Sequence, residues 1–146
     1  MANKFERNFV NDSIFFWLLF TPIIFWIVMY LDNFSVSRLD AETAIQVLII
    51  LPVIEEVIFR GLIQPWLANR YNQKKMGITQ ANLITSCLFV LVHLYQHNLI
   101  MALYTFVPSL VFGYTRDRYK RLMPSIILHS SYNGGYFLIG SQLINY

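Results

Sequence analysis

The chain has 146 residues, of which 56% are hydrophobic and 13% are charged, and its formal net charge is +3. This composition is far more apolar than that of an average soluble domain, and the length allows one domain only. It favours an integral membrane protein, in which basic loops beside anionic lipid headgroups account for the positive charge without a nucleic-acid partner.

Five apolar stretches follow one another along the chain and are separated by polar clusters. Each is near or above the roughly 17 to 25 residues that a helix needs to cross about 30 Å of hydrocarbon. The stretches cover residues 14–31, 43–67, 78–95, 99–115 and 122–144. Only three residues join the third to the fourth, so either of these could be a partial or re-entrant span. We therefore expect one domain, residues 1–146, folded as an all-α, polytopic membrane bundle of about five transmembrane helices.

The connections between the stretches indicate the orientation of the bundle, because cytoplasmic loops near span ends are enriched in lysine and arginine. One side would carry only Arg38. The other side would carry Lys4, Arg7, Arg70, Lys74, Lys75, Arg116, Arg118, Lys120 and Arg121. We therefore expect a multi-pass protein with its N-terminus in the cytoplasm and its C-terminus outside.

The second stretch contains the run LPVIEEVIFRG at residues 51–61, with three ionisable groups in an apolar setting. Such groups cost a few kcal/mol in lipid, so they normally face the bundle interior and serve a site. On a helix, Glu56 and Arg60 stand four residues apart and can form an ion pair, whereas Glu55 points about 100° away. A poorly paired carboxylate in a low-dielectric site is a stronger base, which makes Glu55 the candidate general base. Pro52, at the start of the run, and Pro65, just after it, can bend or end a helix and free backbone carbonyls.

Two other stretches contain histidines. His129 and Asn133 of the segment HSSYN stand four residues apart on one helical face. Together they could donate hydrogen bonds to a developing oxyanion, bind a metal, or hold another helix. His93 ends the segment FVLVH, one turn after Phe89, and a lone histidine near a helix end is more often an interfacial residue.

The depth of these side chains follows from a helix rise of about 1.5 Å per residue. Glu55, His129 and Asn133 come out about 10 to 16 Å from the inner membrane face and so share a layer. A straight third span from residue 78 puts His93 about 22 Å from that face. Tilt, a later helix start near Ala81, or a re-entrant third segment would each bring His93 closer to the layer.

Three patterns, E-E-x-x-x-R, F-x-x-x-H and H-x-x-x-N, occur in this order on three separate apolar stretches. They closely resemble the CPBP family of CAAX-processing and bacteriocin-processing or immunity proteins, which includes the eukaryotic Ras-converting CAAX endopeptidase. The resemblance covers residues 51–135, the motif-bearing core, and includes FRG after the glutamates and PSIILH before the last histidine. It implies an all-helical membrane core and an intramembrane endopeptidase of glutamic type, acting on a membrane-associated, lipidated or tail-sorted protein.

The resemblance also implies roles for particular residues. Glu55 would activate water with help from His93, while His129 and Asn133 would steady the oxyanion of the tetrahedral intermediate. Glu56 and Arg60 match the remaining motif positions and are expected to support the site. Many relatives have more spans than this chain, so the resemblance does not predict the oligomeric state. Small relatives include bacterial processing proteases, which makes a bacterial inner membrane the expected location.

Other interpretations use the same residues. A metal-dependent protease could hold zinc with Glu55, His93 and His129, but the HExxH spacing of common zinc proteases is absent, so we expect no metal and no cofactor. A membrane binding or immunity protein could keep the polar residues only to lock helices together or to recognise a partner. A transporter would need a polar path across all spans. The expected partners are membrane lipids and a protein or peptide substrate.

Overall fold

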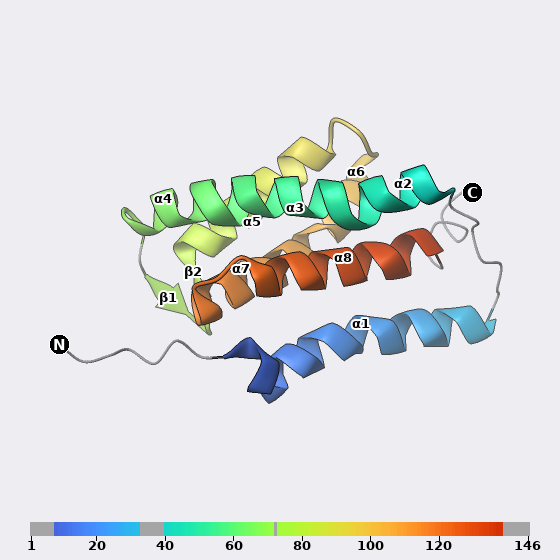
Figure 1. Ribbon diagram of the computed structural model, residues 1–146. Coiled ribbons are helices and arrows are strands. Elements are labelled where there is room, and N and C mark those ends of the chain that lie inside the picture. The colour runs from blue at the N-terminus through green and yellow to red at the C-terminus, as the bar shows by residue number, and fades with distance from the viewer. Residues whose placement is uncertain (1–7, 33–39, 72, 139–146) are drawn as a thin grey trace.

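The computed structural model describes residues 8–32, 40–71 and 73–138. Within these residues the chain forms five helical rods, and each rod matches one of the predicted apolar stretches (Figure 1). The elements in order are η1 (Phe9–Asn11), α1 (Ser13–Asp32), α2 (Ala41–Ile45), η2 (Gln46–Ile50), α3 (Leu51–Glu56), η3 (Val57–Ile63), α4 (Gln64–Ala68), β1 (Lys74–Lys75), β2 (Ile78–Thr79), α5 (Gln80–His93), α6 (Leu99–Tyr104), α7 (Phe106–Tyr119) and α8 (Met123–Leu138). The elements α2 to α4 form one continuous rod, as do α6 and α7. The predicted all-α fold is confirmed, apart from one short hairpin.

Polar side chains mark where three rods begin. Asp40, Thr79 and Asn98 each accept a hydrogen bond from the backbone N–H three residues later, at 2.9, 3.1 and 3.0 Å. Each bond satisfies an N–H group that has no partner within its own helix. The third rod therefore begins at Gln80, and the start predicted at residue 78 is wrong by two residues. A later helix start is one of the three changes expected to bring His93 closer to the layer of Glu55, His129 and Asn133.

The hairpin between α4 and α5 was not predicted from the sequence. Lys74 pairs with Thr79 and Lys75 with Ile78, in antiparallel register. Met76 and Gly77 between them have φ values of 51° and 86°. Positive φ at both central residues is the mark of a type I′ turn, which matches the twist of the two strands. Methionine is an uncommon residue at such a position, so the usual Asn-Gly or Asp-Gly signal is missing from the sequence.

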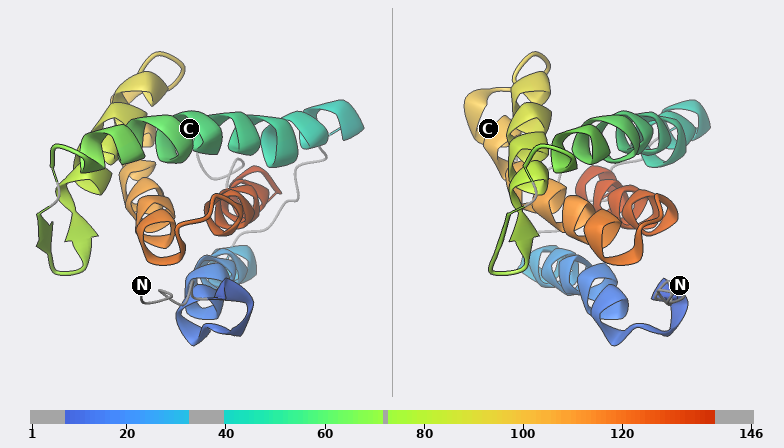
Figure 2. Two further views of the ribbon diagram at one scale, coloured as in Figure 1. Left: turned by 60° about the vertical axis from the view of Figure 1, so that its left-hand side comes forward. Right: turned by 90° about the vertical axis from the view of Figure 1, so that its left-hand side faces the viewer.

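The packing centres on α7 and α8. α7 packs on α5 and α8, and α8 packs in turn on α1, η2 and α3. Figure 2 shows α7 and α8 side by side, with α1 below α8 and the rod of α2 to α4 across the top of both. A cluster of Phe15, Phe112, Tyr119 and Leu128 fills the space where α1, α7 and α8 meet. The inner faces of α3, η3, α7 and α8 therefore point toward a common interior.

The distribution of side chains differs from that in a soluble domain, because many polar groups are buried and many large apolar groups are exposed. Large apolar side chains such as Ile49, Leu62, Leu91 and Val107 are exposed on the outside of the rods. The buried polar side chains include Glu56, Arg60, Gln64, Asn82, Thr85, Ser86, Ser109, Thr115, Ser125 and His129. Polar groups inside and apolar groups outside are expected where lipid replaces water as the solvent.

The number of membrane crossings is a separate question. Among the described residues, one helix, Leu99–Tyr119, is long and apolar enough to cross a membrane by its length and composition. Ser13–Pro22 and Gln80–His93 are shorter apolar helices. The predicted total of five crossings stays a prediction, as does the N-terminus in the cytoplasm. Residues 139–144 of the predicted last span lie outside the described residues.

Basic residues gather at one end of the bundle. The β1–β2 hairpin, with Lys74 and Lys75, lies at the same end as the start of α1 and the end of α7 (Figure 1). There Arg118 Nη2 lies 2.7 Å from Asp12 Oδ2. Partial burial raises the pKa of Asp12, whereas the hydrogen bond from Arg118 lowers it. The net result is a pKa below the ordinary aspartate value. This end corresponds to the side expected in the cytoplasm, although Lys4, Arg7 and Arg38 lie outside the described residues.

At Gly113, the backbone of α7 lies directly against the side chain of Asn82 on α5. A Cβ atom added to Gly113 would overlap the side-chain amide of Asn82. Asn82 is fully buried, donates to the Leu110 carbonyl at 3.0 Å and accepts a hydrogen bond from Ser86 Oγ at 3.2 Å. The amide therefore cannot move aside without breaking both hydrogen bonds.

Gly113→Ala is expected to destabilise the protein by about 1 to 3 kcal/mol, because overpacking outweighs the gain of about 1 kcal/mol in helix propensity. The measurement is the thermal unfolding midpoint of the purified protein in detergent. Gly134→Ala is the matched control, since its new Cβ would meet only Leu48 Cδ2 at 3.8 Å, an ordinary contact. Equal midpoints for the two variants would contradict the close approach.

Candidate active site

The two adjacent glutamates differ in their access to solvent. Glu55 and Glu56 end α3, and the π-helical segment η3 follows at once with Arg60. The side chains of Glu56 and Arg60 are 0% exposed, whereas that of Glu55 is 27% exposed. Of the two carboxylates, Glu55 is the one that a substrate or a water molecule can reach.

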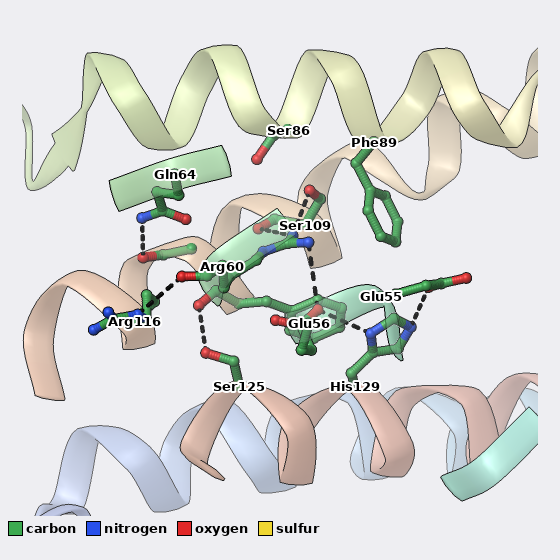
Figure 3. Close-up of polar contacts among 12 residues, drawn as sticks. Glu55, Glu56, Arg60, Gln64, Ser86, Phe89, Ser109, Arg116, Ser125 and His129 are labelled. Atoms are coloured by element: carbon green, nitrogen blue, oxygen red, sulfur yellow. Dashed lines mark hydrogen bonds and ion pairs between the residues drawn. The ribbon is translucent and has the colours of Figure 1, made fainter. Parts of the chain in front are cut away.

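His129 on α8 lies between the two glutamates (Figure 3). Its Nδ1 is 3.0 Å from Glu56 Oε1, and its Nε2 is 3.4 Å from Glu55 Oε2. A neutral imidazole carries one N–H and can donate to one carboxylate only, whereas an imidazolium donates to both. His129 therefore joins the paired glutamate to the accessible one.

Arg60 is held from several sides. Its Nη1 lies 3.3 Å from Glu56 Oε1, so the ion pair predicted from helical spacing is present. Its Nη2 donates to the carbonyl of Ser109 at 2.9 Å and to Ser109 Oγ at 2.7 Å (Figure 3). The guanidinium carbon also lies 4.9 Å from the ring centroid of Phe89 and 5.6 Å from that of Phe112. Cation–π contact with these rings compensates for guanidinium N–H groups that lack hydrogen-bond acceptors.

The cluster places two carboxylates beside one arginine. Arg60 balances the charge of the buried Glu56. His129 lies against both carboxylates, so a second proton on its ring would balance the other negative charge.

Asn133 holds a backbone carbonyl that a proline has left without a donor. In η2 the hydrogen bonds run five residues back, so that Leu51 N–H donates to Gln46 O. The same pattern would pair the next residue, Pro52, with Val47 O, but proline has no N–H. Asn133 Nδ2 donates to Val47 O at 2.9 Å instead. One of the two N–H groups of this amide thus ties α8 to the rod that contains the glutamates. The second N–H takes no part in this contact, so it can donate to another acceptor.

His93 lies at the edge of the cluster. Its Nδ1 donates to the carbonyl of Phe89 at 2.9 Å, which leaves Nε2 as the acceptor of a neutral ring. Its ring centroid is 4.3 Å from that of Phe89, and the Phe89 ring is 5.9 Å from that of His129. Phe89 therefore separates the two histidines.

Zinc would require Glu55, His93 and His129 to surround one ion. Within the part of the chain that the structure describes, no group of three or more His, Cys, Asp or Glu side chains is placed to hold a metal ion. The residues present do not fit a zinc site in this arrangement. The expectation of no metal and no cofactor stays a prediction.

Two contacts of the site were not predicted. Ser109 on α7 binds the guanidinium of Arg60, and Phe112, also on α7, stacks on His129 with ring centroids 4.7 Å apart and an angle of 17°. α7 contains none of the three motifs, and a serine or phenylalanine in an apolar stretch has no distinctive spacing. The one available signal was that both residues lie on a single face of this helix.

A comparison with known protein families identifies a match. The family model described as type II CAAX prenyl endopeptidase, Rce1-like, matches residues 15–135. No curated protein and no solved structure matches the chain. The matched residues include every member of the charged cluster and both flanking residues, His93 and Asn133.

Proposed function

The chain belongs to the family of Rce1-like type II CAAX prenyl endopeptidases, and on this premise we propose that it is an intramembrane endopeptidase in which Glu55 activates the attacking water. One observation carries the proposal. Glu55 is the accessible member of a buried cluster of ionisable groups, and it faces His129 Nε2 at 3.4 Å. A base and a hydrogen-bond donor therefore border the same space.

In the proposed reaction, Glu55 takes a proton from water as the water oxygen attacks the scissile carbonyl carbon. The carbonyl oxygen becomes an oxyanion in the tetrahedral intermediate. Glu55 then returns the proton to the amide nitrogen, the C–N bond breaks, and the products are a carboxylic acid and an amine, between which the acid proton finally passes to leave carboxylate and ammonium. His93, with Nε2 as an acceptor, is assigned to orient the water. This scheme needs neither a serine nor a cysteine nucleophile.

His129 is proposed to stabilise the oxyanion by donating from Nε2. The contact of 3.4 Å to Glu55 Oε2 is long for a hydrogen bond, so a substrate oxygen can compete for this donor. Asn133 is assigned to the same task with its second amide N–H, while its first holds Val47 O. Both donors then come from one face of α8.

Glu56 and Arg60 are proposed to position His129. Glu56 Oε1 accepts from Nδ1 and so sets the orientation of the ring, as carboxylates do for catalytic and metal-bound histidines. Arg60 balances the charge of Glu56 in the interior. The proposed substrate is a membrane-associated protein with a C-terminal lipid group, in keeping with the family description.

The test uses the purified chain in lipid vesicles with two synthetic peptides, identical except that one is prenylated on a cysteine near its C-terminus. We expect one internal cleavage of the prenylated peptide, located by mass spectrometry, and activity that survives a chelator. Loss of activity on chelation would favour the metal-dependent alternative. If neither peptide were cleaved, and Glu55→Gln still performed the function in cells, a binding or immunity protein would replace the proposal.

A further inference from the structure

α7 carries none of the three motifs, yet one of its faces meets the charged cluster at three points. Ser109, Phe112 and Arg116 are spaced by three and four residues, which places them on one side of a helix. All three contact Arg60, either its side chain or its backbone. We call these three residues the α7 face.

Ser109 fixes the far end of the Arg60 side chain. Its Oγ and its backbone carbonyl both accept from the same nitrogen, Nη2, at 2.7 and 2.9 Å. Both residues are fully buried, so no water replaces these acceptors. The opposite nitrogen, Nη1, is thereby directed at Glu56.

Arg116 fixes the backbone of Arg60. In η3, as in η2, hydrogen bonds run five residues back, and Gln64 N–H donates to Phe59 O. The next residue, Pro65, has no N–H to offer to Arg60 O. Arg116 Nε donates to Arg60 O at 3.0 Å instead (Figure 3). This contact holds the π-helical turn that directs Arg60 into the interior, at the carbonyl that the proline leaves without a donor.

Phe112 contacts both Arg60 and His129. Its ring stacks on the imidazole of His129 at 4.7 Å, and the Arg60 guanidinium carbon lies 5.6 Å from its centroid. The residue is 2% exposed and belongs to the main core cluster. The plane of the His129 ring is therefore set by α7 as well as by Glu56.

We propose that Ser109, Phe112 and Arg116 are positioning residues for the catalytic centre, and that they act through Arg60 and His129. The inference rests on the proposed function. It adds the rod of α6 and α7 to the three motif-bearing rods that form the catalytic centre. It assigns Arg116 to the active site, although the sequence analysis counted this residue only among the basic residues of the cytoplasmic side.

Arg116 gives the sharpest test, because it contacts the site through the backbone carbonyl of Arg60 and not through a glutamate or a histidine. Arg116→Met is expected to lower kcat by about 10- to 100-fold with KM within about twofold, since a displacement of about 1 Å in a catalytic centre has effects of that size. Arg116→Lys, which keeps a donor, is expected to recover part of the loss. Arg118→Met is the matched control, because Arg118 pairs with Asp12 on another side of the same helix.

A second measurement does not depend on catalysis. The chain has three histidines, so ¹⁵N-histidine spectra resolve the His129 ring, which His129→Ala assigns. Arg116→Met is expected to shift the His129 signals, and Arg118→Met to leave them in place. Unchanged His129 signals together with unchanged kcat in Arg116→Met would overturn the inference while the proposed function stood. Equal losses in Arg116→Met and Arg118→Met would show a general role in stability and overturn it too. Absence of cleavage by the unmodified chain would count against the proposed function, and the His129 signals would still decide the positioning role.

Discussion

Glu55→Gln is expected to abolish proteolysis and to leave the fold unchanged. The amide keeps the shape of the side chain but cannot take a proton from water, and general-base catalysis contributes about 10²- to 10⁴-fold to a rate. We expect kcat to fall by about that factor with little change in KM, because the carboxylate acts on water and not on substrate affinity. Steady-state kinetics on the cleaved peptide provide the measurement.

Stability should respond much less to this substitution. The side chain of Glu55 is partly exposed, and its ion pair with His129 is long, at 3.4 Å. The thermal midpoint of Glu55→Gln should therefore stay close to that of the unmodified chain. Glu42→Gln is the matched control, since Glu42 lies on α2, where it contacts Gln46 at 3.5 Å and takes no part in the cluster. Full activity in Glu55→Gln would rule out Glu55 as the base and overturn the proposed mechanism.

The rods could be predicted because hydrophobic length is a property of the sequence alone. The ends of the rods depended on hydrogen bonds from single side chains, which hydropathy does not describe. Hydropathy places residues 78 and 79 in the third span, but Thr79 accepts a hydrogen bond from Asn82 N–H and so precedes the helix as its cap. The hairpin before it depends on positive φ at Met76, a conformation for which methionine gives no signal.

The site could be predicted in part, for an equally physical reason. The Glu56 and Arg60 pair follows from helical spacing. The contact of His129 with both glutamates joins rods that are far apart in the sequence, so spacing within one helix could not predict it. Helix rise placed Glu55 and His129 in one layer, and the resemblance to a family grouped them in one site.

Backbone acceptors were the least predictable part of the site. Pro52 and Pro65 indicated that carbonyls would be freed near the glutamates. Nothing in the sequence indicated that Asn133 and Arg116 would donate hydrogen bonds to these carbonyls, because a carbonyl acceptor has no side-chain pattern of its own. The same holds for Ser109, whose carbonyl and hydroxyl accept from Arg60.

The largest effect on stability is expected from Arg60→Met. Removing one partner of a buried ion pair costs about 3 to 5 kcal/mol, because the other charge stays in the interior without compensation. Here Glu56 would remain, fully buried, with His129 as its one remaining side-chain partner in the described cluster. Arg60→Lys is expected to restore little, since an ammonium group lacks the planar fork that reaches Glu56 and Ser109 together and lies beside Phe89. Denaturant or thermal unfolding in detergent measures both variants.

A double variant separates the two roles of this ion pair. Glu56→Gln with Arg60→Met removes both charges, and replacing a buried ion pair by neutral groups is often close to neutral for stability. We therefore expect the double variant to be more stable than Arg60→Met alone, with a coupling energy of about 1 to 3 kcal/mol in the mutant cycle. Its proteolytic activity should still be lost, because residue 56 no longer offers a carboxylate that fixes the ring of His129. If the double variant regained activity together with stability, the pair would serve only to hold the helices together. Recovery of stability without activity would show that Glu56 and Arg60 act in catalysis by positioning His129.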